Sequence, residues 1–198
     1  MNKFLIAMTG LMVCGCGRAI PTQPVPVASF EQLMESPGGP SIITETTAGK
    51  LVELLEPKYK ELDPASVIVH GDSVATDGVT TRGVRVVLIA NASSANDRKA
   101  SNVANFYMEE TEVHACSAAV KTEIAFADTE SKNPPQAQKD IRWASKDGMV
   151  MFSGFSDGQP SYSISTMRAG GPILGLQKDQ FAKFGELLDA ALNSTRSN

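Results

Sequence analysis

Long hydrophobic runs are scarce in this sequence of 198 residues. The longest is residues 4–13, and the next candidate, residues 84–90, is shorter and is interrupted by Arg85. A membrane-spanning helix needs about 20 apolar residues to cross roughly 30 Å of hydrocarbon. We therefore expect no membrane-spanning segment in the mature chain.

Basic residues are also few. The chain has 18 lysines and arginines against 22 aspartates and glutamates, and its formal net charge is −4. The densest basic run is only Arg98 and Lys99. Nucleic-acid binding depends on clustered Lys and Arg side chains that neutralise phosphates. The charge balance argues against a nucleic-acid partner.

Residues that bind metals are scarce as well, with two histidines and three cysteines in the chain. A metal site needs three or four converging ligands. Soft groups are present at Met149 and Met151, so a periplasmic metal carrier is kept as a second alternative. Residues 168–172 are glycine-rich but lack the ending of a phosphate-binding loop. We expect no cofactor.

The N-terminus has the order of a secretory signal peptide. Lys3 gives a positive start, the apolar run follows, and Gly15 and Cys16 come directly after it. This segment resembles the lipobox of bacterial lipoproteins, where a small residue precedes the modified cysteine and an aliphatic residue lies three positions before it. Gly15 and Val13 fill those places before Cys16. The family prefers leucine to Val13, and Cys14 is an unusual neighbour.

The resemblance implies removal of residues 1–15 and attachment of acyl chains to Cys16, which would anchor the protein to a membrane. Two or more chains give stable attachment. In bacteria with two membranes, Gly17 in place of aspartate favours the outer membrane. The alternative is an ordinary signal peptide cut near Arg18, which would release a soluble secreted or periplasmic protein.

Removal of residues 1–15 leaves 183 residues and a net charge of 17 − 22 = −5. Residues 16–28 read as a lipidated cysteine and a proline-rich tether, which reaches roughly 35–40 Å if extended. Residues 29–193 read as a single domain, and residues 194–198 as a polar tail. Cys116 is then the one unmodified cysteine, so we expect no intrachain disulfide.

The sequence pattern predicts an α+β fold. Helices are predicted at residues 29–35 and 46–62 and from Asp179 onward, where apolar residues recur every three or four positions. Strands are predicted at residues 67–69, 83–90, 111–126 and 161–167, and in a hairpin around Asp147 and Gly148. We expect a single antiparallel sheet with N-terminal helices and a C-terminal amphipathic helix packed on one face.

Two residue pairs are weak catalytic candidates. On a strand, His114 and Cys116 would share a face, and the imidazole could lower the pKa of the thiol. However, a cysteine among alanines is also typical of a small buried apolar residue. His70 and Asp72 offer a base beside a carboxylate, or simply the end of a strand.

The interpretation that these observations favour is a lipid-anchored cell-envelope protein. Its domain would bind or scaffold an envelope protein partner without catalysing a reaction, and its ligand is not specified by the sequence. The alternative is an exported hydrolase or thiol enzyme that uses His114 with Cys116, or His70 with Asp72. We assign no catalytic residue.

Overall fold

The computed structural model describes residues 28–36, 43–53, 64–76, 78–91, 101–132, 140–156, 159–167 and 171–196. The signal peptide, Cys16 and nearly all of the tether lie outside these ranges. None of the helices among the described residues is long and apolar enough to span a membrane.

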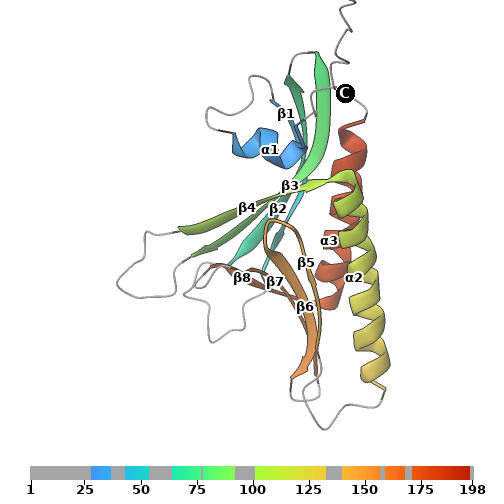
Figure 1. Ribbon diagram of the computed structural model, residues 1–198. Coiled ribbons are helices and arrows are strands. Elements are labelled where there is room, and N and C mark those ends of the chain that lie inside the picture. The colour runs from blue at the N-terminus through green and yellow to red at the C-terminus, as the bar shows by residue number, and fades with distance from the viewer. Residues whose placement is uncertain are drawn as a thin grey trace, which may run out of the picture.

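The described residues form two four-stranded antiparallel sheets, and each sheet is followed by a helix (Figure 1). A short helix, α1 (Phe30–Glu35), comes first. The first unit consists of β1 (Ile43–Val52), β2 (Ser66–Thr76), β3 (Val79–Asn91), β4 (Ser101–Glu109) and α2 (Glu110–Glu130). The second unit consists of β5 (Asp140–Ala144), β6 (Met149–Ser156), β7 (Gln159–Thr166), β8 (Ile173–Leu176) and α3 (Lys178–Ser194). The α+β class is confirmed, but the prediction of a single sheet is wrong.

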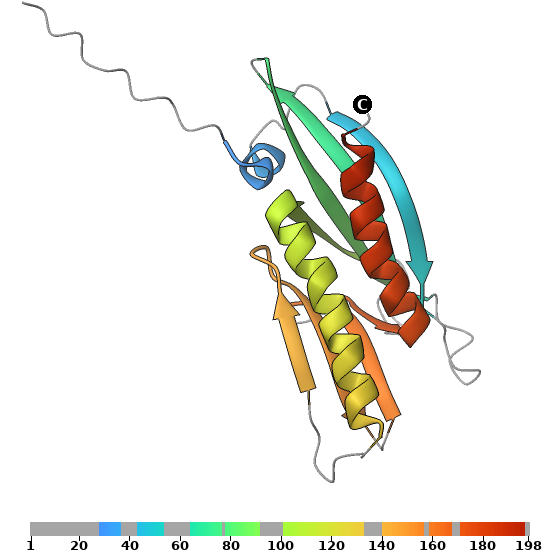
Figure 2. The same cartoon turned by 90° about the vertical axis from the view of Figure 1, so that its right-hand side faces the viewer.

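Each sheet packs chiefly against the helix of the other unit. α3 contacts β1 and β2, whereas α2 contacts β5 and β6 as well as the ends of β3 and β4. The two helices lie side by side (Figure 2). One cluster of buried apolar side chains therefore joins both sheets and both helices.

The second predicted N-terminal helix, at residues 46–62, is wrong where the structure describes it, because residues 43–52 form β1. Three threonines lie in this stretch, and β-branched side chains favour strands. Leu51 is half-buried against the core while its neighbours Lys50 and Val52 are exposed, which is the alternation of a strand. The leucines that suggested a helix beyond residue 53 lie outside the described residues.

The strands predicted at residues 111–126 are also wrong, because this stretch belongs to α2. Its buried positions recur at helical spacing and include Val113, Cys116, Val120 and Ala127. Glu112, Ser117 and Glu123 lie on the same buried side, so polar residues interrupt the apolar stripe. That interruption hid the helix from the sequence pattern.

The remaining elements agree better with the sequence. The predicted helix at residues 29–35 corresponds to α1, which begins with a capping box: Gln32 N donates to Ser29 Oγ, and Ser29 N donates to Gln32 Oε1. Gly148 has a positive φ of 83° in the predicted hairpin turn. The C-terminal helix buries its apolar stripe, including Phe181 and Phe184.

Candidate binding face of the first sheet

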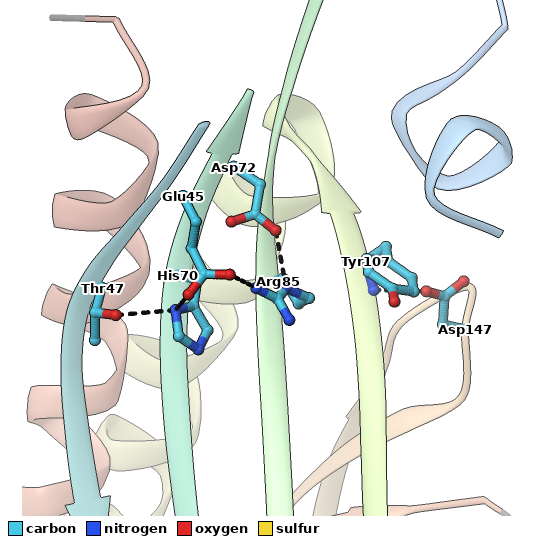
Figure 3. Close-up of polar contacts among 7 residues, drawn as sticks. All are labelled: Glu45, Thr47, His70, Asp72, Arg85, Tyr107 and Asp147. Atoms are coloured by element: carbon cyan, nitrogen blue, oxygen red, sulfur yellow. Dashed lines mark hydrogen bonds and ion pairs between the residues drawn. The ribbon is translucent and has the colours of Figure 1, made fainter. Parts of the chain in front are cut away.

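The face of the first sheet that points away from α2 and α3 is called the outer face here (Figure 3). The opposite side carries buried residues such as Val67, Val86 and Phe106. Because side chains alternate along a strand and the β2–β3–β4 register is regular, the outer-face residues follow directly. They include Glu45, Thr47, Lys50 and Val52 of β1; Ser66, Ile68, His70 and Asp72 of β2; Gly83, Arg85, Val87 and Ile89 of β3; and Val103, Asn105, Tyr107 and Glu109 of β4.

Four of these residues form an ionic row across three strands: Glu45, His70, Asp72 and Arg85. Arg85 Nε donates to Asp72 Oδ2 at 2.8 Å, and the same guanidinium binds the carboxylate of Glu45. His70 Nδ1 lies 3.1 Å from Glu45 Oε1 and 3.1 Å from Thr47 Oγ1. The row is a consequence of register, because His70 is paired with Arg85, and Glu45 with Asp72.

The charges of the row depend on one another. Asp72 is fully buried, and this burial raises the pKa of its carboxyl group, while Arg85 acts in the opposite direction. Burial by itself would lower the pKa of Arg85, but Asp72 and Glu45 outweigh it and leave the pKa raised, so the guanidinium stays charged. Asp72 Oδ1 is buried and has no hydrogen-bond partner among the residues that the structure describes. The row is therefore held in place with one acceptor unsatisfied.

α1 closes the upper end of the outer face. The Phe30 side chain is fully buried against Gly83, where an added Cβ would lie 2.2 Å from the ring. Only glycine leaves room for this contact. Phe30 also meets Tyr107 edge-on, with ring centroids 6.3 Å apart.

The β5–β6 turn closes the same end from the side. Tyr107 N donates to Asp147 Oδ2 at 2.6 Å. The carboxyl group of Glu31 in α1 hydrogen-bonds with that of Asp147, which raises the pKa of Glu31 to about 7, and burial and the charges of Asp147, Glu35 and Glu112 add to the effect. This end of the face is strongly acidic.

The lower end of the outer face is more apolar and partly exposed. Val52, Ser66, Ile89 and Val103 form one cross-strand row. Val103 is 52% exposed and Val52 is 39% exposed. The outer face thus combines an ionic upper half with exposed apolar side chains below it.

His70 and Asp72 share a face, as their spacing predicted, but the structure gives them different partners. Asp72 binds Arg85, whereas His70 lies against Glu45 and Thr47. No hydrogen bond between the two is present. Their geometry is that of an ionic row rather than of a base oriented by a carboxylate.

His114 and Cys116 do not share a face. They lie on a helix, where positions two apart point to opposite sides. His114 is exposed, with Nε2 3.7 Å from Glu110 Oε1, whereas Cys116 is buried with Sγ 3.7 Å from Met151 Sδ. Burial raises the pKa of the Cys116 thiol well above its ordinary value, and three nearby carboxylates add to this. Such a thiol is a poor nucleophile.

The groove between α2 and α3 and the two methionines considered as metal ligands provide weaker candidate sites than the ionic row. A shallow groove of about 350 Å³ between α2 and α3 is lined by His114, Lys121 and Asp189, among others. Met149 and Met151 are both fully buried in the core. Within the described ranges, no group of three or more His, Cys, Asp or Glu side chains is placed to hold a metal ion.

Sequence reasoning missed Glu45, Thr47 and Arg85. Arg85 left a signal, since it is the one charged residue in the apolar stretch 84–90. Glu45 left no such signal, because a helix was predicted at residues 46–62 and the strand that carries Glu45 was not expected. No protein-family model matches this chain, and no curated protein sequence matches it with significant similarity.

Proposed function

We propose that this protein is a lipid-anchored component of the cell envelope whose domain binds or scaffolds a partner protein through the outer face of the first sheet. The observation that carries the proposal is the ionic row, in which Glu45 is exposed, beside the exposed apolar side chains of Val52 and Val103. The anchor is proposed from Val13, Gly15 and Cys16. Its expected location is the outer membrane in a bacterium that has one.

The row is suited to recognition because its side chains are already fixed by their mutual contacts. Little conformational entropy is then lost when a partner binds. Glu45 is 45% exposed and can accept hydrogen bonds from a partner, whereas Asp72 is fully buried and holds Arg85 in place. We infer a partner with basic or N–H donor groups opposite the row and apolar side chains opposite Val52 and Val103.

A charge-reversal pair tests the surface. The full-length chain is recovered from membranes with its partners, and Glu45→Lys is compared with Glu186→Lys on the exposed side of α3. Both variants make the same change in charge. We expect Glu45→Lys to lose the partner that the native chain and Glu186→Lys retain. The melting temperature of Glu45→Lys should fall somewhat, because the new positive charge lies beside Arg85 and His70, but it should remain folded under the conditions of recovery. Equal recovery by both variants contradicts the proposed surface.

The anchor is tested separately with Cys16→Ser. We expect the native chain to carry acyl mass on Cys16, to have lost residues 1–15 and to sediment with membranes. Cys16→Ser should leave the membrane fraction. A native chain found without acyl mass refutes the anchor but leaves the binding face to be judged by the charge-reversal pair.

A further inference from the structure

The four sheet edges differ in how they avoid pairing with other strands. β1 carries a bulge between Thr47 and Gly49, and β5 is five residues long and bears the exposed ion pair Asp140–Arg142. β8 has four residues, and its Gly175 N–H is donated to Glu53 Oε1 at 3.2 Å. Bulges, charges, shortness and capping are the usual protections of an edge strand.

As far as the structure describes the chain, β4 lacks these protections over half of its length. It has nine residues, and the stretch 101–105 contains no charged residue. Its register with β3 is regular from Gly83–Glu109 to Asn91–Ser101, so no bulge bends it away. Val103 in the middle of this stretch is half exposed. An uncharged, regular, partly apolar edge is the kind that pairs with another strand.

The orientation of the backbone follows from one hydrogen bond. Tyr107 N–H is donated to Asp147, so it points away from β3. In an antiparallel ladder the direction of the N–H and C=O groups alternates along the strand. Asn105 and Val103 therefore also present their N–H and C=O groups at the free edge, and no hydrogen-bond partner for these groups is found among the described residues.

We propose that two copies of this chain associate by antiparallel pairing of their β4 edges, with the two-fold axis passing Ala104. In this arrangement Val103 of each copy lies opposite Asn105 of the other, and each such pair exchanges two backbone hydrogen bonds. Ala104 lies opposite Ala104, where small side chains meet. The first sheets of the two copies become one continuous eight-stranded sheet.

The free edge fits a second copy in both length and charge. Asp147 occupies the edge at Tyr107, and pairing about Ala104 places Ser101, the first residue of β4, opposite Tyr107. The partner strand thus begins where the free edge ends. Because the paired stretch is uncharged, two copies of an acidic protein meet here without like charges opposite each other. This association is independent of the proposed outer-face partner.

A proline substitution tests the hydrogen bonds. Asn105→Pro removes an N–H at the free edge but none from the ladder with β3, while Asn105→Ala changes the side chain and keeps the N–H. Sedimentation of the full chain in detergent measures its mass. We expect dimers for the native chain and Asn105→Ala, and monomers for Asn105→Pro at an unchanged melting temperature. A monomeric native chain, or a dimer that survives Asn105→Pro, overturns the proposal.

Disulfide cross-linking tests the register. In Ala104→Cys the paired Cα atoms would lie about 4.5 Å apart, within the range of a disulfide. In Asn105→Cys the equivalent atoms would lie about 9 Å apart, which is too far. The buried thiol of Cys116 is present in both variants, so it does not account for a difference between them. We expect rapid cross-linked dimers from Ala104→Cys alone. Equal cross-linking of both variants, or none, contradicts the two-fold pairing about Ala104.

Discussion

Glu123 offers a sharp test of how α2 packs on the second sheet. Its side chain is 1% exposed, and within the described part of the chain neither carboxylate oxygen has a hydrogen-bond partner. Burial raises its pKa from 4.5 to about 7. The position is on the buried side of α2, between Val120 and Ala127. Replacing Glu123 with methionine, an unbranched side chain of similar length, removes the charge while keeping most of the volume.

The sign and size of the effect follow from this pKa. Between pH 4.5 and 7 the unfolded chain releases the Glu123 proton while the folded chain retains it, so the free energy of unfolding falls as the pH rises. Each tenfold change in the dissociation constant is worth about 1.4 kcal/mol, so the full cost of ionisation is about 3 kcal/mol and is reached above pH 7. The stabilisation by Glu123→Met should thus be about 3 kcal/mol larger at pH 8 than at pH 4.

Urea unfolding of the native chain and Glu123→Met at pH 4 and pH 8 measures this difference. Glu186→Met, which removes an exposed glutamate from α3, is the matched control and should change stability little at either pH. Glu31 also has a raised pKa of about 7, but it is common to all of these proteins and cancels in the comparison. If Glu123→Met raises the free energy of unfolding equally at both pH values, or lowers it at pH 8, the Glu123 carboxyl is not buried without a partner as described.

Three further predictions concern the outer face and the thiol. Arg85→Met leaves Asp72 buried without its charged partner and should lower the free energy of unfolding by about 3 kcal/mol at pH 7. The loss should be smaller at pH 4, because Asp72 can take up a proton there, and equal losses at both pH values would contradict this. Phe30→Ala and Gly83→Ala should each detach α1, so urea unfolding of the double variant should show clearly less than additive losses; additive losses would show that the two residues do not meet. Cys116 should react with a thiol reagent only slowly in the folded protein, and rapid labelling near pH 7 would restore the thiol-enzyme alternative.

Local patterns in the sequence predicted much of the second half of the chain. The apolar stripe beginning at Phe181 and the turn at Gly148 correspond directly to α3 and the β5–β6 hairpin. The β-branched run at residues 84–90 correctly predicted the core of β3. These features depend on neighbours close in sequence, which is why they were visible.

The division into two sheets could not be read in this way. It depends on α2, whose buried side mixes Glu112, Ser117 and Glu123 with apolar residues. That mixture weakens the helical periodicity, and the Val and Thr residues nearby favoured strands. The structure shows which charged positions are buried, a property of tertiary packing.

The candidate site was predicted only in part. The two-residue spacing of His70 and Asp72 correctly placed both on one face of a strand. Glu45 reaches Arg85 from another strand 40 residues away, so the contact depends on the register of β1, β2 and β3. The same spacing placed His114 and Cys116 together wrongly, because it applies to strands alone.

Photo-cross-linking in intact membranes tests the central claim, that the outer face of the first sheet binds a partner in the cell envelope. A photoreactive residue is placed at exposed Thr47 on the outer face or at exposed Lys121 on α2 of the full-length chain. The account predicts an adduct of one reproducible mass from Thr47 and none of that mass from Lys121. Adducts from Lys121 alone, or none from either position, would contradict it.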